Sequence, residues 1–169
     1  MVSSTTALRA ESVIRQFAQC GVTHVINLPD TESKFMYDAI KAEPSLTLLP
    51  VCREGESMAI AAGLILGGKR PVVQIQSTGF FESGDSIRGI CLELKLPLLL
   101  LIGYRGYVGP GGTPRDSAAR FLEPILTAWG IPFATVSSDA DAHQIGAVYQ
   151  RAQREGRTTA VLIAKEFES

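Results

Sequence analysis

The sequence has few cysteines, no apolar run of membrane-spanning length and no excess of either charge. Its three cysteines, Cys20, Cys52 and Cys91, are widely spaced and odd in number, which fits neither a disulfide framework nor a zinc site. A reducing, cytoplasmic setting is therefore expected. The stretch 1–6 is polar, so no signal peptide is expected, and the apolar stretch 96–103 is far too short to cross a bilayer.

The charged residues exclude several classes of function. Sixteen basic and seventeen acidic residues give a net charge of −1, and the basic ones are scattered, so neither a nucleic acid nor a membrane is expected as a partner. His24 and His143 are isolated, and we expect both to be structural or solvated. The glycine-rich stretch 109–112 lacks the lysine and the strand-to-helix context of a phosphate-binding loop. No metal site is predicted in this chain.

What the sequence does contain is a regular alternation of apolar runs and amphipathic segments. Its 169 residues are enough for one domain, and 46% of them are hydrophobic. We predict strands at 22–28, 46–51, 71–76, 96–103, 133–136 and 158–164, and helices at 8–20, 33–42, 55–66, 83–94, 116–129 and 140–154. This order predicts a single three-layer α/β/α domain over residues 1–169, with a six-stranded, mainly parallel sheet.

In such a sheet, ligands bind beyond the carboxyl ends of the strands. The loops that should lie there are 29–33, 52–56, 76–84 and 103–114. The last of these holds five glycines and two prolines. A loop of that length in a compact domain is typical of a functional lid or an interface segment.

Two acids, Glu54 and Glu56, follow the second predicted strand and open an Ala-rich helix. Acids at a helix start commonly do no more than stabilise the helix dipole. The small residues that follow, through Gly63, permit close packing against a neighbour. Burial at such a contact would make a carboxylate there chemically consequential.

Polar residues and a glycine follow the third predicted strand, and two adjacent phenylalanines come after them. The segment 74–84 is compatible with an ordinary turn whose aromatic side chains enter the core. If Phe80 and Phe81 were exposed, they would instead indicate an interface. After the fourth predicted strand, Arg105 has two readings of equal weight: a bidentate contact to an anionic substrate, or a structural role.

In their order along the chain, four segments resemble the pyrimidine-binding domain of thiamine-diphosphate enzymes. More closely, they are similar to the alpha subunit of sulfopyruvate decarboxylases and the matching half of phosphonopyruvate decarboxylases. The resemblance covers nearly the whole chain. The four segments are 53–63, 67–71, 76–79 and 96–106.

The resemblance implies a role for several residues. In the family a Glu nine residues before a Gly hydrogen-bonds the cofactor's pyrimidine ring. Glu54 stands nine residues before Gly63, so the role passes to Glu54 rather than Glu56. The predicted contacts to the cofactor are made by Glu54, Gln76, Ser77, Thr78 and Gly79. Those to the substrate are made by Thr31, Arg105, Phe80 and Phe81.

Many related sequences carry Asn-Ser-Gly-Leu-Gly-Asn in the region where this chain reads Ser77-Thr78-Gly79-Phe80-Phe81-Glu82-Ser83-Gly84, which changes both size and polarity at the mouth of the site. The chain also lacks the Gly-Asp-Gly segment and later Asn pair that hold the cofactor's diphosphate and Mg²⁺. The resemblance then implies a separate diphosphate-binding beta subunit, which holds the Mg²⁺ and shares the thiamine diphosphate. A hetero-oligomer with even numbers of subunits is expected, because the Ala-rich helix and the two phenylalanines need a surface to pack against.

The expected function is that of the alpha subunit of a heteromeric 2-oxoacid decarboxylase, a carboxy-lyase active only with its partner. Its substrate would be a small anionic 2-oxoacid, sulfopyruvate or phosphonopyruvate. Two alternatives stay open at this point. One is a subunit of a thiamine-diphosphate carboligase or of another 2-oxoacid decarboxylase. The other is a non-catalytic module that keeps the fold.

Overall fold

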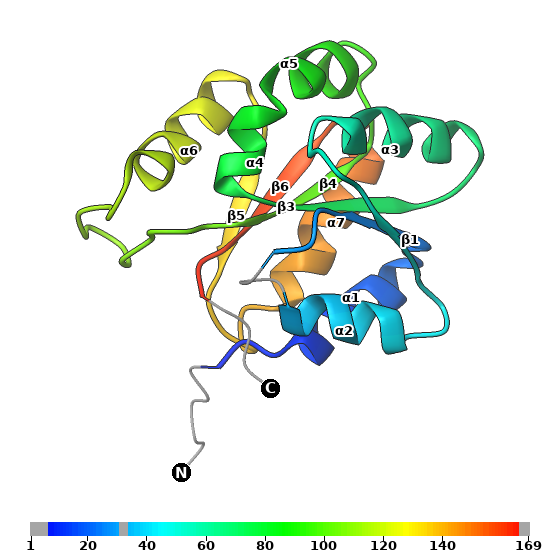
Figure 1. Cartoon of the computed structure of the whole chain (residues 1–169), viewed down its shortest axis with the longest axis horizontal. Coiled ribbons are helices and arrows are strands. Elements are labelled where there is room, and N and C mark those ends of the chain that lie inside the picture. Colours follow the sequence, from blue (N-terminus) through cyan, green and yellow to red (C-terminus); the bar gives the residue numbers. More distant parts are fainter. Residues whose placement is uncertain (1–6, 31–33, 166–169) are drawn as a thin grey trace.

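A computed structural model describes residues 7–30 and 34–165, which form a six-stranded sheet covered by helices on both faces (Figure 1). The strands are β1 (His24–Asn27), β2 (Thr47–Pro50), β3 (Pro71–Gln76), β4 (Leu99–Gly103), β5 (Phe133–Val136) and β6 (Thr159–Ile163). Their order across the sheet is β2-β1-β3-β4-β6-β5, and every pairing is parallel. The predicted α/β architecture is therefore confirmed.

The helices form two layers. The first is made of α1 (Ala10–Cys20), α2 (Lys34–Ala42) and α7 (His143–Glu155). The second is made of α3 (Glu56–Leu66), α4 (Ser77–Glu82), α5 (Gly84–Ser86), the π-helical η1 (Ile87–Leu92) and α6 (Ser117–Ala128). No helix in the described part of the chain is long and apolar enough to cross a membrane.

Alternation along the buried strands produces two hydrophobic cores. In β4, Leu99 and Leu101 pack with α1, α2 and α7, whereas Leu100 and Ile102 pack with α3, α4 and α6. All four side chains are almost wholly inaccessible to solvent. This is the pattern of a central parallel strand with both faces covered.

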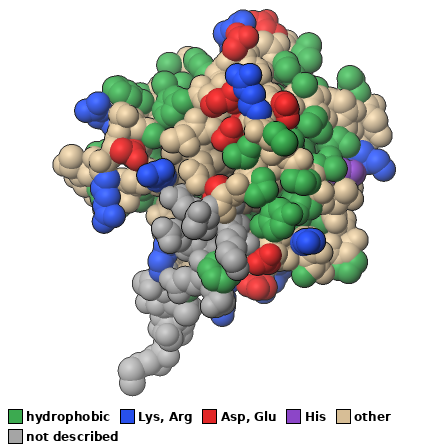
Figure 2. Space-filling view, viewed as in Figure 1, with side chains coloured by type: hydrophobic (Ala, Val, Ile, Leu, Met, Phe, Trp, Pro, Cys, Tyr) green, Lys and Arg blue, Asp and Glu red, His purple; other side chains and the backbone are tan. Residues whose placement is uncertain are grey.

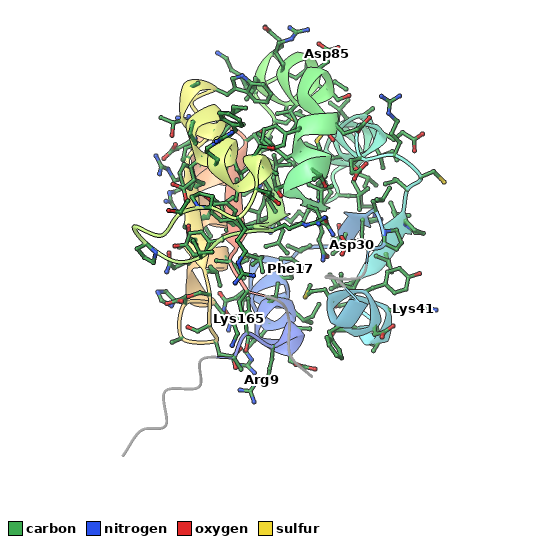
Figure 3. All side chains as sticks on the ribbon, turned by 60° about the vertical axis from the view of Figure 1, so that its left-hand side comes forward. Arg9, Phe17, Asp30, Lys41, Asp85 and Lys165 are labelled. Carbon is green, nitrogen blue, oxygen red and sulfur yellow. The ribbon has the colours of Figure 1, made fainter. Side chains whose placement is uncertain are left out.

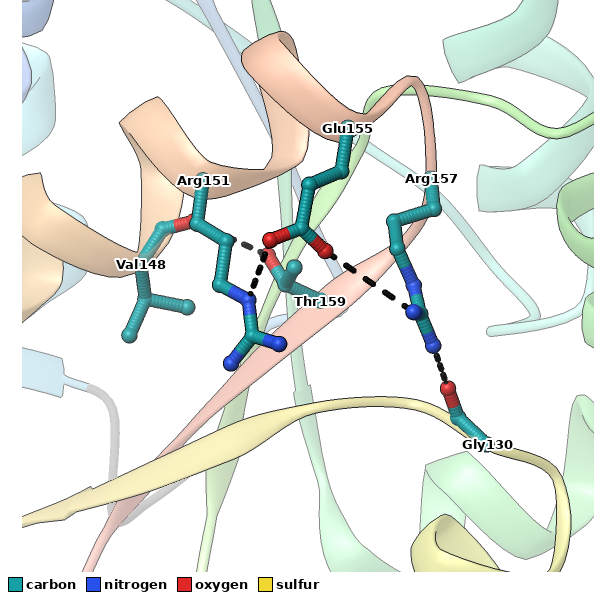
Figure 4. A network of polar contacts seen from close by, with 6 residues as sticks. All are labelled: Gly130, Val148, Arg151, Glu155, Arg157 and Thr159. Carbon is teal, nitrogen blue, oxygen red and sulfur yellow. Dashed lines mark hydrogen bonds and ion pairs between the residues drawn. The ribbon is translucent and has the colours of Figure 1, made fainter.

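Three features hold the amino end of β6 (Figure 4). The Glu155 carboxylate at the end of α7 pairs with Arg151 and Arg157. Arg157 also donates a hydrogen bond to the carbonyl oxygen of Gly130, in the turn before β5. The hydroxyl of Thr159 donates to the carbonyl oxygen of Val148 at 3.3 Å. The turns that precede β5 and β6 are thus tied together at the amino edge of the sheet.

Most element boundaries agree with the sequence-based ones, and one segment differs clearly. The loop predicted at 76–84 is largely helical, because α4 begins at Ser77 directly after β3. Phe80 is buried, with its ring 5.6 Å from that of Trp129, and this contact with α6 favours the helix. The strand predicted at 96–103 begins at Leu99 instead.

A side-chain cap stabilises the start of α6. Asp116 has extended backbone angles, and its Oδ1 accepts a hydrogen bond from the Ala119 N–H at 2.9 Å, as an N-cap does. We expect Asp116→Ala to lower the free energy of unfolding by about 1 kcal/mol, because it orphans a helix N–H group. Urea denaturation of the chain measures this. Asp116→Asn keeps the acceptor and should lose less than half as much, whereas equal losses would contradict the capping role.

Candidate active site

The crossovers that follow β1 and β3 leave the sheet on opposite faces. The chain passes from β1 to α2 in one helix layer and from β3 to α4 in the other, although β1 and β3 are neighbours. Such a switch point opens a crevice at the carboxyl ends of the strands. A cavity of about 200 Å³ lies there. Its lining comes from Asp30, Gln74, Ile75, Gln76, Leu101, Gly103, Tyr104, Arg105, Gly106, Tyr107, Arg115, Ile163, Ala164 and Lys165.

The cavity carries an excess of positive charge. Arg105, Arg115 and Lys165 line it, and Asp30 is its one acidic lining residue within the described chain. Figure 3 labels Asp30 and Lys165 at this edge of the molecule. Elsewhere, on the face seen in Figure 2, acidic and basic side chains are interspersed. A cationic cavity of this size fits a small anion.

A closed loop brings the two arginines together. The Arg115 N–H donates a hydrogen bond to the Gly106 carbonyl oxygen at 3.0 Å. Gly106 has a φ of 79°, and a Cβ there would lie 3.1 Å from the Asp116 carboxylate. A side chain at position 106 is therefore disfavoured twice, by the backbone angle and by the close approach.

Tyr104 anchors the same loop on α6. Its hydroxyl donates to the Glu123 carboxylate at 3.0 Å, and its ring lies 4.7 Å from that of Tyr107. Burial, with a further contribution from Glu123, raises the pKa of Tyr104 above its ordinary value, so the hydroxyl stays a neutral donor. Arg105 follows an anchored residue while its own side chain is exposed at the cavity.

Two buried amides lie together in the sheet at this switch point. Asn27 and Gln74 are register partners on β1 and β3. Both are almost fully buried, yet both amide atoms of Asn27 and the Oε1 of Gln74 have no hydrogen-bond partner. Because an unpaired buried amide is costly, such groups mark a place where a ligand could complete the hydrogen bonding.

Glu54 is not among the residues that line this cavity. Its half-buried side chain packs on Gly79 in the first turn of α4, where a Cβ would lie 2.6 Å from the Glu54 Cγ and Oε1. Only glycine leaves room for the carboxylate in this position. Glu54 and the cavity thus approach the end of β3 from two sides, since Gln76 lines the cavity and Gly79 follows three residues later.

The other predicted site residues do not all lie at the cavity. Gln76 lines the cavity, Ser77 is buried with a hydroxyl that has no partner, and Thr78 is exposed. Phe80 is 1% exposed and packs in the core, and Phe81 is half-buried beside it. Their predicted contacts with a substrate stay predictions, which the burial of Phe80 does not favour. Thr31 lies outside the described residues.

Sequence reasoning missed several residues that the fold brings to this edge. Arg115 and Lys165 line the cavity from segments that the sequence analysis did not connect with Arg105. A signal was present for Asn27 and Gln74, since each is an amide in a strand whose other buried residues are apolar. Within the described chain, no group of three or more His, Cys, Asp or Glu side chains is placed to hold a metal ion.

Known proteins resemble this chain over most of its length, although no family model matches it. It is 25% identical over 155 residues to the sulfopyruvate decarboxylase subunit alpha of Methanothermobacter thermautotrophicus. The alignment covers 91% of this chain and 94% of that subunit. The chain resembles a decarboxylase alpha subunit almost from end to end. The predicted resemblance is confirmed.

Longer proteins also match. The phosphonopyruvate decarboxylase of Streptomyces viridochromogenes is 24% identical over 106 residues, which cover 63% of this chain and 27% of that protein. A solved 2-oxoglutarate:ferredoxin oxidoreductase from Magnetococcus marinus has a TM-score of 0.72 and 16% identity, with 90% of this chain and 28% of that one covered. At this identity the solved structure shows a shared fold alone. This chain spans little more than a quarter of either protein.

The cysteines offer a simple check of the surface beside Glu54. Cys52 is exposed, whereas Cys20 and Cys91 are buried, and burial raises the pKa of Cys91 to about 12. Since the thiolate is the nucleophile, iodoacetamide at pH 8 should modify Cys52 and spare Cys91 in the folded chain. Peptide mass spectrometry identifies the modified residue. Cys52→Ser should remove the labelling, and equally rapid modification of all three thiols before unfolding would contradict the structure.

Proposed function

We propose that this chain is the pyrimidine-binding alpha subunit of a heteromeric, thiamine-diphosphate-dependent 2-oxoacid decarboxylase of sulfopyruvate or phosphonopyruvate type. One observation carries the proposal. The Glu54 carboxylate, which has no hydrogen-bond partner within the described chain, lies against Gly79 beside a cationic cavity at the switch point of the sheet. The similarity to decarboxylase alpha subunits supports it.

The residues present fit the pyrimidine half of the cofactor. Glu54 offers an acceptor that no protein donor occupies, and Ser77 offers a buried hydroxyl without a partner. The missing side chain at Gly79 gives the carboxylate its position. In this proposal Glu54 hydrogen-bonds the pyrimidine ring nitrogen, while Gln76, Ser77, Thr78 and Gly79 border the ring.

When bound, thiamine diphosphate supplies the electron sink that lets carbon dioxide leave a 2-oxoacid. The chain's own contribution is to hold a proton and to orient the reactants. Glu54 holds the proton at the ring nitrogen, and the contact with Gly79 limits the positions that its carboxylate can take. The half-buried side chain leaves fewer water molecules to compete for that hydrogen bond.

The cavity supports the second part of the proposal, an anionic substrate. A 2-oxoacid with a sulfonate or phosphonate group carries two negative groups, and the cavity offers Arg105 and Arg115, with Lys165 at its edge. Neither arginine side chain has a hydrogen bond or ion pair within the described residues. The amide of Gln74 in the lining offers a neutral hydrogen bond to the same ligand.

The proposal includes a beta subunit that binds the diphosphate and Mg²⁺ and completes the site, in a cytoplasmic hetero-oligomer with even numbers of subunits. The shares of two relatives that the alignments cover support a division of the enzyme between chains. The alignment covers 94% of a relative whose name is that of an alpha subunit. It covers 27% of the phosphonopyruvate decarboxylase, which has most of its length beyond the match.

Reconstitution with the beta subunit tests this function. The complex should release carbon dioxide from sulfopyruvate or phosphonopyruvate, and the alpha chain alone should release none even with thiamine diphosphate and Mg²⁺. Glu54→Gln should lower turnover at least about 100-fold, because it removes a positioned acid. Glu56→Gln is the matched control, since that neighbouring acid is exposed, and it should stay near wild type.

Two outcomes would contradict the proposal. Near-normal turnover by the Glu54→Gln complex would sink the assignment of Glu54, and decarboxylation by the alpha chain alone would sink the divided site. Analysis of the products separates a decarboxylase from a carboligase, because a carboligase yields a new carbon–carbon bond.

The role of Arg105 is tested by substrate kinetics. We expect Arg105→Ala in the complex to lower kcat/KM about tenfold, mainly through KM, because a charged hydrogen bond to the substrate is lost. Arg105→Lys should recover part of the loss. Arg154→Ala, an exposed arginine in the last turn of α7, is the control. If the Arg105 and Arg154 variants had the same KM, Arg105 would have no part in binding.

A further inference from the structure

The start of α3 lacks a cap from its own sequence. No side chain caps Gly55, the residue that precedes the helix. Instead the Glu82 carboxylate, at the end of α4, accepts a hydrogen bond from the Gly55 N–H through Oε2 at 2.9 Å. A helix start leaves unpaired N–H groups, and here a carboxylate from another helix satisfies one of them.

The other oxygen of the same carboxylate is also used. Oε1 of Glu82 accepts a hydrogen bond from the Arg53 Nε, which forms an ion pair. This hydrogen bond from Arg53 holds the pKa of Glu82 below its ordinary value, so the carboxylate stays ionised at neutral pH. Arg53 and Gly55 are the two residues on either side of Glu54. The Glu82 carboxylate therefore binds both chain neighbours of Glu54, the acid that is proposed to contact the cofactor.

Helix α4 also contacts Glu54 itself, through Gly79. Gly79, against which the Glu54 side chain packs, precedes Glu82 by three residues and so lies on the same side of the helix. Gly79 limits where the carboxylate goes, and Glu82 fixes the backbone that carries it. Two backbone hydrogen bonds close the turn that leads into α3. The Glu56 N–H donates to the Arg53 carbonyl oxygen, and the Ser57 N–H donates to the Glu54 carbonyl oxygen.

We infer that Glu82 is a positioning residue, which fixes the turn 53–55 so that Glu54 meets the pyrimidine ring; this inference rests on the proposed function. Stability is a poor explanation of the contact. Arg53 is 71% exposed and Glu82 31% exposed, and ion pairs on the surface contribute little to stability. The contact instead fixes the position of the turn that carries Glu54. Position matters here because a displacement of about 1 Å at a catalytic group is enough to slow a reaction about 100-fold.

The experiment uses Glu82→Ala and Glu82→Gln in the complex with the beta subunit. Three quantities are measured: the thiamine diphosphate dissociation constant by calorimetry, kcat and KM for the 2-oxoacid, and amide hydrogen exchange at Gly55 in the alpha chain without cofactor. Glu82→Ala should raise the dissociation constant and lower kcat, each about tenfold, with KM for the oxoacid changed less than about twofold.

Glu82→Gln is the conservative variant, since its amide oxygen still accepts from the Gly55 N–H. It should stay within about threefold of wild type in kcat and keep the slow exchange at Gly55, whereas Glu82→Ala should speed that exchange. Asp85→Ala is the matched control. Asp85 pairs with Arg88 three residues on and is 90% exposed, and Figure 3 shows it at the top of the molecule, away from Asp30.

The outcomes are separable. If Glu82→Ala binds thiamine diphosphate and turns over like wild type while Glu54→Gln is inactive, the inference about Glu82 is wrong and the proposed function stands. If the wild-type complex binds no thiamine diphosphate, the proposed function fails and the inference fails with it. If Glu82→Ala does not fold, Glu82→Gln decides: fast exchange at Gly55 with unchanged cofactor affinity would also overturn the inference.

Discussion

Burial of the central strands on both faces is the constraint from which the rest of the structure follows. Along β3 and β4 nearly every side chain is inaccessible to solvent, so each strand has little besides apolar surface to offer along its length. Polar chemistry is thereby confined to the carboxyl ends of the strands. Gln74 is the exception in β3, and together with Asn27 it places unpaired amide groups where the two crossovers diverge.

The same constraint explains why the acid and the cavity belong to different layers. After β3 the chain turns into α4 without a loop, and α4 packs beside the start of α3, so Glu54 meets Gly79 on that face. After β4 the chain instead makes a long closed loop, which returns Arg115 to Arg105. The end of β3 is where the two arrangements meet, since Gln76 lines the cavity and Gly79, three residues later, contacts Glu54.

The sequence predicted what depends on local pattern. The bounds of β3 and β5 agree with those predicted, because they follow from neighbouring residues alone. The loop predicted at 76–84 rests on the polar residues and Gly79 that follow β3, and tertiary packing of Phe80 on Trp129 prevails over that local preference. The same distinction separates the parts of the candidate site.

Glu54 could be proposed from the sequence because its signal is a spacing of nine residues to Gly63 and a resemblance. The pairs of Asn27 with Gln74, Glu82 with Arg53 and Arg105 with Arg115 depend on how distant segments meet, and no spacing along the chain announces them. The sequence therefore allowed Glu54 to be proposed, but not the contact of Glu82 with its neighbours or the buried amides Asn27 and Gln74.

The contact of Glu82 with its two partners has two components that respond differently to the solvent. The ion pair with Arg53 is exposed, so dissolved salt screens its Coulombic attraction. The hydrogen bond from the Gly55 N–H is short-ranged and directional, and it does not require the arginine. The turn that presents Glu54 therefore keeps its main restraint at high ionic strength. Arg53 serves chiefly to aim the Glu82 carboxylate, whose second oxygen accepts the Gly55 hydrogen bond.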